Sequence, residues 1–172
     1  CVQQIGEQNM QKVSFETSDG VKIVGNYWHG SDRAVLLLHM MPATKESWNK
    51  FAKALNNENI TVLAIDLRGH GESVKQDGEI LDFRQFDDSQ HEASINDVEA
   101  AVDYLKRKNA SKISIAGASI GANLALQYQS EHAEIEKTVL LSAGLNYRGV
   151  LTEPAAKKLS SSQEVFLAAG TM

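Results

Sequence analysis

The chain has 172 residues, of which 42% are hydrophobic and 23% charged, and it contains 12 glycines and 2 prolines. This composition excludes disordered, collagenous and low-complexity proteins, and the length predicts one domain large enough to bury a core. The net charge of −5 argues against nucleic acid as a partner, and the single cysteine leaves no intrachain disulfide and no paired-cysteine metal or redox site.

The chain starts at Cys1 rather than at methionine, which resembles a bacterial lipoprotein after removal of its signal peptide, with lipid on the cysteine. On this interpretation residues 1–11, which are polar and without periodicity, form a flexible N-terminal segment that tethers a domain of residues 12–172 to the cell envelope. The alternative is a partial gene product, for which a cytoplasmic location is expected. The sequence leaves both open.

The first part of the chain predicts a hairpin followed by two buried strands. Residues 12–28 form the hairpin, with period-2 alternation and a turn signal at Asp19-Gly20. Residues 34–39 and 60–65 are apolar at consecutive positions, as in strands covered on both faces of a parallel sheet. A helix capped by Thr44 is predicted between them. Its apolar face comprises Trp48, Phe51, Ala52 and Leu55.

The second part alternates helices with strands. Residues 66–88 are polar and irregular, and apolar residues at helical spacing then predict helices over 92–108 and 119–131. Three further strands are predicted, at 112–116, 138–141 and 164–168. The order predicts a single α/β domain: a mostly parallel sheet with helices on both faces, preceded by an N-terminal antiparallel hairpin.

Gly117-Ala-Ser119-Ile-Gly121 lies between a predicted strand and the helix that follows it, which is the setting of a nucleophile elbow. A serine at such a turn projects its hydroxyl above the sheet, and Gly117 and Gly121 permit close approach of helix and strand. The Ile120 N–H at the helix start is positioned to stabilise an oxyanion. Ser119 is therefore the predicted nucleophile. The alternative is a small-residue turn that only packs tightly.

The same glycines could instead belong to a phosphate-binding loop. Dinucleotide sites need a further glycine that this chain lacks, because Asn123 stands where the reductase variant has one. Such loops also follow the first strand of a sheet rather than the fifth. Tyr104 and Lys108 have the spacing of a reductase pair but precede the loop. We therefore expect no cofactor.

Two more motifs follow buried strands: His39-Met-Met-Pro42, and then Asp66-Leu-Arg-Gly-His-Gly-Glu-Ser73. Together with the serine motif they resemble, in order and placement, the α/β-hydrolase superfamily, from about Lys12 onward. The arrangement is most similar to small bacterial dienelactone-hydrolase-like and serine-aminopeptidase-like enzymes.

The resemblance implies roles for the residues of these motifs. The N–H of Met41 would complete the oxyanion hole with that of Ile120, although Met40 stands where the family usually has glycine. Structural rather than catalytic roles, in fixing loops around the site, are implied for His39, Asp66, Arg68, Gly69 and Gly71.

Asp66, His70 and Glu72 are close enough in sequence to suggest a metal site. Metal ligands must converge in space, however, and Arg68 between them adds repulsion. No metal is therefore expected.

A serine nucleophile needs a base, and in this superfamily a carboxylate and then a histidine follow the serine. After Ser119 the only histidine is His132. Thirteen helical residues place it roughly 20 Å away, so it cannot be the base. Glu153 is a weak candidate for the acid. The sequence thus resembles a hydrolase that stops before its acid, its base and its last strand and helix.

Two classes of function remain. The first is a serine hydrolase that acts on a small-molecule ester, thioester or amide through an acyl-enzyme on Ser119, with the 172-residue chain weak or inactive by itself. The second is a non-catalytic or degenerate α/β-hydrolase-like binding domain. In the first case residues 164–168 form an open sheet edge, which predicts self-association.

Overall fold

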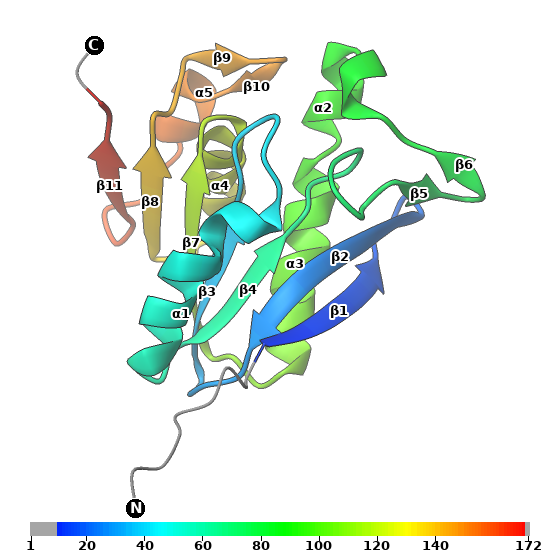
Figure 1. Ribbon diagram of the computed structural model, residues 1–172. Coiled ribbons are helices and arrows are strands. Elements are labelled where there is room, and N and C mark those ends of the chain that lie inside the picture. Colours follow the sequence, from blue (N-terminus) through cyan, green and yellow to red (C-terminus); the bar gives the residue numbers. More distant parts are fainter. Residues whose placement is uncertain (1–9, 171–172) are drawn as a thin grey trace, which may run out of the picture.

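The computed structural model describes residues 10–170 of the chain (Figure 1). Strands β1 (Met10–Glu16) and β2 (Val21–Trp28) form the predicted antiparallel hairpin, with Phe15 opposite Ile23. Strand β1 begins two residues before the predicted start of the domain. Cys1, on which the lipid-anchor prediction depends, lies outside the described residues.

One nine-stranded sheet organises the molecule, in the order β11-β8-β7-β3-β4-β2-β5-β6 with β1 paired to β2. Its other strands are β3 (Arg33–Leu38), β4 (Thr61–Ile65), β5 (Lys75–Gln76), β6 (Glu79–Ile80), β7 (Lys112–Ala118), β8 (Lys137–Leu141) and β11 (Glu164–Ala168). Strands β3, β4, β7, β8 and β11 pair in parallel, and the pairings of β2 are antiparallel. The predicted α/β class is confirmed.

Helices cover both faces of this sheet, as predicted. Helix α1 (Asn49–Asn57) connects β3 to β4, whereas α4 (Ile120–Glu131) connects β7 to β8 in the opposite direction across the sheet. Because parallel crossovers are right-handed, opposite directions place the two helices on opposite faces. Helix α3 (Ile95–Arg107) shares the face of α4 (Figure 1).

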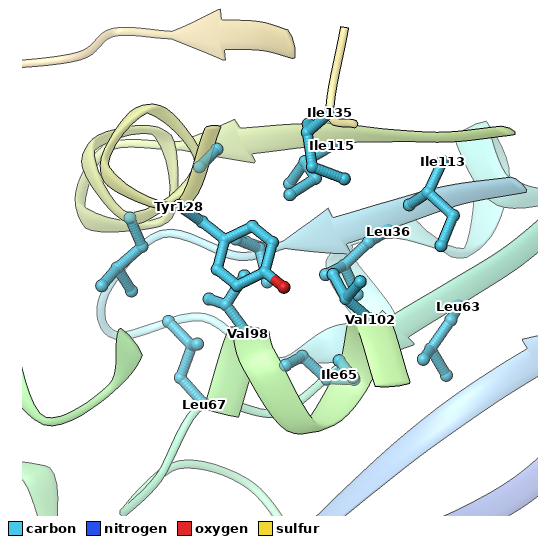
Figure 2. Packing of buried hydrophobic residues seen from close by; sticks show 14 of the residues in the cluster. Leu36, Leu63, Ile65, Leu67, Val98, Val102, Ile113, Ile115, Tyr128 and Ile135 are labelled. Atoms are coloured by element: carbon cyan, nitrogen blue, oxygen red, sulfur yellow. The ribbon is translucent and has the colours of Figure 1, made fainter. Parts of the chain in front are cut away.

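The buried strands divide their side chains between two clusters. Leu36 and Leu38 of β3 join the larger cluster under α3 and α4, which also contains Val102 and Tyr128 (Figure 2). Leu37, between them, joins a smaller cluster under α1. The alternation explains why a doubly covered strand is apolar at consecutive positions.

Several local predictions were wrong. Thr44 precedes a short 3-10 helix, η1 (Lys45–Trp48), and its side chain makes no capping hydrogen bond. Phe51 is 46% exposed rather than inward. The helix predicted over residues 92–108 begins at Ile95 as α3, and Glu92 instead ends a separate helix, α2 (Asp88–Glu92), which has a capping box between Asp87 and Gln90.

The segments expected to be irregular contain short elements. These are the β5–β6 hairpin, η2 (Phe83–Gln85), the β9–β10 hairpin (Asn146–Tyr147 and Val150–Leu151) and α5 (Glu153–Ala156). Across residues 10–170, no helix combines the length and the apolar character needed to span a membrane.

Candidate active site

Ser119 is the single residue between β7 and α4, and its backbone is in a region that favours glycine (φ 53°, ψ −120°). A Cβ on Gly121 would lie 2.5 Å from the Leu38 carbonyl oxygen, and one on Gly117 would collide with the Gly121 carbonyl. Strand, turn and helix therefore approach so closely that both glycines are sterically required.

Hydrogen bonds from two elements hold the serine backbone. The Ser119 N–H donates to the Leu141 carbonyl at the end of β8 (2.9 Å), and the Ser119 carbonyl accepts from Ala122 and Asn123 at the start of α4. The serine side chain is half-buried. The strained conformation is thus maintained by the surrounding sheet and helix, as is common at functional sites.

The loop after β3 lies against the N-terminus of α4, since the His39 carbonyl is also within 2.7 Å of a Cβ placed on Gly121. The Met40 carbonyl accepts from Ala43 (2.8 Å) around a cis Met41–Pro42 peptide. Within residues 10–170, no backbone carbonyl accepts from the N–H of Met41 or of Ile120. Both predicted oxyanion donors are therefore without a backbone acceptor among these residues.

His39 is fully buried at the end of β3. Its Nδ1 donates to the Met40 carbonyl (2.9 Å) and its Nε2 accepts from the Leu67 N–H (3.0 Å), so both ring nitrogens bind backbone. Burial lowers the pKa of His39 from its usual value. The ring therefore acts as a neutral link between two loops.

Asp66 is fully buried and holds the loop that follows β4. It accepts from the Lys45 N–H and Nζ (2.8 Å each) and from the Glu72 N–H (2.9 Å). A Cβ on Gly71 (φ 50°) would collide with the Asp66 carboxylate. Burial alone would lower the pKa of Lys45, but bonds to Asp66, Glu72 and Glu46 raise it above its usual value.

Arg68 connects three parts of the fold. Its Nε donates to Asp97 on α3 (2.9 Å), and its two terminal nitrogens donate to Asp19 in the β1–β2 turn (2.7 and 2.9 Å). Hydrogen bonds from Arg68 lower the pKa of Asp19, whereas burial raises the pKa of Asp97 to about 6. Gly69 follows with φ 76°.

The three side chains considered for a metal are engaged by other protein groups. Asp66 and Glu72 bind Lys45, while the His70 Nδ1 donates to the Arg68 carbonyl and its ring stacks on Phe83 at 3.9 Å. Among residues 10–170, no group of three or more His, Cys, Asp or Glu side chains is arranged to hold a metal ion.

His132, which the sequence excluded as the base, and the other histidines of residues 10–170 make their contacts with groups other than Ser119. His132 stacks on Tyr128 (3.7 Å) and its Nδ1 donates to the Tyr128 carbonyl. His91 is buried on α2 against Phe86 (5.3 Å). Within residues 10–170, none of the five histidines makes a hydrogen bond with Ser119. Glu153, the candidate acid, is exposed and pairs with Lys157.

Sequence reasoning missed the groups that hold these motifs in place. Lys45 and Asp97 belong to no motif, and Asp19 was assigned only to a turn signal; the structure shows all three as ion-pair partners. For Asn123 the sequence did contain a signal, because it is a polar residue in an otherwise apolar stretch of α4. The structure shows that it is fully buried.

The fold and the elbow define this molecule as an α/β-hydrolase. The model of the serine aminopeptidase S33 family matches residues 30–168, and the chain belongs to that family. Among solved structures, an esterase of Pyrococcus furiosus, Pf2001, is similar with a TM-score of 0.66 and 28% identity over 78% of this chain and 52% of that one.

Two curated relatives are similar in sequence. An AB hydrolase superfamily protein of Bacillus subtilis, YisY, is 28% identical over 66% of this chain and 39% of its own length. A non-heme chloroperoxidase of Kitasatospora aureofaciens, CPO-A1, is 30% identical over 74% of this chain and 42% of its own length. The chain thus spans about two fifths of these relatives and about half of the similar esterase.

Proposed function

We propose that Ser119 is the nucleophile of a serine hydrolase that cleaves a small-molecule ester, thioester or amide through an acyl-enzyme. One observation carries the proposal: a half-buried serine is held at φ 53° between β7 and α4, directly before Ile120, whose N–H has no backbone acceptor among residues 10–170. The esterase and hydrolase relatives support the same chemistry.

In this mechanism the Ser119 oxygen attacks the substrate carbonyl carbon, and its proton passes to a general base. The carbonyl oxygen becomes an oxyanion that accepts from the N–H groups of Met41 and Ile120. Collapse of this tetrahedral intermediate expels the alcohol, thiol or amine, which takes the proton from the base. An ester (acyl-enzyme) is left on Ser119. Water then hydrolyses this ester by the same steps in reverse order.

No histidine among residues 10–170 is hydrogen-bonded to Ser119 as a base. All five histidines of the chain fall within these residues. The same observation favours the second candidate function, a binding domain of hydrolase type that performs no chemistry. Without a base, a serine hydroxyl provides almost no nucleophile at neutral pH.

Substitution of Ser119 distinguishes the two. In a form of the protein that turns over esters, we expect Ser119→Ala to abolish hydrolysis of p-nitrophenyl esters and labelling by a fluorophosphonate, with a loss of several orders of magnitude in kcat. Ser130→Ala is the matched control, because this serine lies on the same helix and bonds only the Gln127 carbonyl. Activity that survives in Ser119→Ala contradicts the proposal.

A further inference from the structure

The face of the sheet under helix α1 is left partly uncovered. Helix α1 packs mainly on β4, so β8 and β11 lie beyond it (Figure 1). Val139 of β8 is in register with Ala116 of β7 and Phe166 of β11, so these three side chains point to the same face. Ala116 is buried in the cluster under α1, whereas Val139 is 36% and Phe166 65% exposed. An apolar strip therefore runs from α1 toward the edge of the sheet.

A groove of about 590 Å³ lies on this strip, between α1 and β8. Trp48 and Phe51 form its wall on the helix side, with ring centroids 5.9 Å apart. The strands contribute its floor, which consists of Ala116, Val139 and Leu141. Pockets for small molecules have volumes in this range and are lined mostly by apolar and aromatic side chains. The groove thus has the size and the lining of a small-molecule site.

The groove is separate from the candidate active site. Ser119 and the predicted oxyanion donors, Met41 and Ile120, do not line it. The two sites come closest at Leu141, whose side chain lines the groove and whose carbonyl accepts from the Ser119 N–H (2.9 Å). A ligand in the groove would therefore not take the place of a substrate at Ser119.

Lys50 gives the groove its charge. Of the side chains within residues 10–170 that line the groove, it is the only ionisable one. It is exposed, and in this part of the chain it forms no ion pair. A lysine can lay its methylenes along apolar surface while its ammonium group stays in water. The charge and the lining together favour a ligand that has an anionic head and an apolar body.

We propose that the groove binds a medium-chain fatty acid, with the chain against Trp48 and Val139 and the carboxylate at Lys50. The inference is independent of the chemistry proposed for Ser119. A neutral apolar molecule and a second copy of the chain are the competing occupants, and the experiments below distinguish both from a fatty acid.

The first test measures binding to the 172-residue chain by fluorescence, because no turnover is needed. The chain has two tryptophans, Trp28 and Trp48, and Trp48 lines the groove. We expect octanoate with a bromine at the end of its chain to quench this fluorescence saturably, and Trp48→Phe to remove most of the quenching. In competition, affinity should rise roughly threefold per methylene from hexanoate to decanoate. Absence of saturable quenching at millimolar concentrations overturns the proposal.

The second test concerns the carboxylate. Lys50→Gln should weaken octanoate binding about threefold, as expected for an exposed ion pair, and should leave octanol binding unchanged. Lys53→Gln is the matched control, because Lys53 is an exposed lysine on the same helix that does not line the groove. An equal effect of Lys50→Gln on the acid and the alcohol, or no effect on either, would show that the groove selects no anion and would refute the proposal.

The third test blocks the groove. Val139→Glu should abolish binding, because it places a carboxylate on the apolar floor. Val165→Glu is the control: Val165 is 37% exposed on β11 and points to the opposite face of the sheet. If Val139→Glu does not fold, Lys50→Gln still decides, since that side chain is on the surface.

Protein concentration distinguishes a fatty acid from a second copy of the chain. Octanoate affinity should be the same in dilute and concentrated protein. Affinity that falls as the protein concentration rises would show that another copy covers the groove, and this result would overturn the proposal. Because hydrolysis is not measured in any of these tests, activity in Ser119→Ala refutes the proposed function and leaves this inference standing.

Discussion

Ser119 holds the most unfavourable backbone conformation of the candidate site. A non-glycine residue at φ 53° and ψ −120° costs of order 1–3 kcal/mol, which the rest of the fold must offset. The hydrogen bond from its N–H to Leu141 and the contact of Gly121 with β3 supply the constraint. The strain therefore lies at the one residue whose hydroxyl has to project from the sheet.

We expect Ser119→Gly to raise the free energy of unfolding by about 1 kcal/mol, because glycine adopts this conformation without penalty. Ser119→Ala is the matched control: it also removes the hydroxyl but keeps the Cβ and its strain. Urea unfolding of both variants measures the difference. Equal stabilities would show that the turn is unstrained.

Buried histidines predict how stability depends on pH. Burial, and then the nearby His39, lower the pKa of His70 to about 4. The unfolded chain, with a pKa near 6.5, binds more protons than the native state between these values, so stability falls as pH decreases through this window. The maximum loss from this residue is about 3 kcal/mol.

We therefore expect His70→Gln to flatten the decrease in unfolding free energy between about pH 6.5 and pH 4. His29→Gln, at an exposed histidine, should keep the wild-type slope. Chemical unfolding across this pH range provides the measurement. A slope that His70→Gln leaves unchanged would exclude His70 as its source.

At the residue scale the sequence predicted the motifs better than their supports. Ser119 lies at the strand-to-helix turn where the pattern put it. Lys45 and Asp97, however, are charged residues whose burial depends on partners from other elements. No local pattern encodes such a pair, because the compensation arises only after the elements pack.

At the scale of the elements, Arg68 joins three segments through Asp19 and Asp97. These are the β1–β2 turn, the loop after β4 and helix α3. Asp97 is fully buried and has no competing cation at comparable distance among the ion pairs of residues 10–170. Removal of one member of a buried pair is costly because the remaining charge is left uncompensated. The hydrogen bonds of Arg68 thus connect three elements of the fold.

Arg68→Met should lower the free energy of unfolding by about 3 kcal/mol at neutral pH. The loss should be larger at about pH 8 than at about pH 5, because an unpaired Asp97 with a raised pKa is protonated in the native state at low pH. Arg107→Met, at an exposed arginine on α3, is the control. A pH-independent loss would contradict this account.

Elements with a strong apolar pattern were predicted closely, and β11 has the predicted range of residues 164–168. The β9–β10 hairpin was missed because each strand is two residues long and side chains such as Asn123 and Thr152 hold its base. Phe51 follows the helical period but is exposed, because α1 leaves the β8 end of its sheet face uncovered. Hydrophobic periodicity predicts which face of a helix is apolar, but it does not predict which other element covers that face.

For the whole molecule, the β11 end of the sheet has apolar side chains exposed on both faces. Phe166 is 65% and Leu167 64% exposed, and their side chains point to opposite faces. The exposed surface continues into a groove of about 590 Å³ beside Trp48 and Val139. Within residues 10–170, β11 pairs only with β8, so its outer edge is open.

We expect the 172-residue chain to self-associate through this edge in a concentration-dependent way. Leu167→Lys should shift the equilibrium toward monomer, because a charged residue blocks pairing of an edge strand. Ile80→Lys is the control: Ile80 is 70% exposed on β6, an edge strand of only two residues at the other end of the sheet. Sedimentation velocity gives the readout, and a monomer at every concentration would refute the expectation.

The central position of β3 has a consequence for how the protein is made. Among the strands of the central parallel sheet β4 follows β3 in the chain, so we expect these two to pair early in synthesis; the other side of β3 pairs with β7, with Arg33 opposite Lys112, and β7 is made much later. Throughout the synthesis of the intervening residues, this apolar strand has one unpaired side, a state that favours chaperone binding. Because the elbow rests on the Leu38 carbonyl, the serine acquires its geometry only when this delayed pairing is complete.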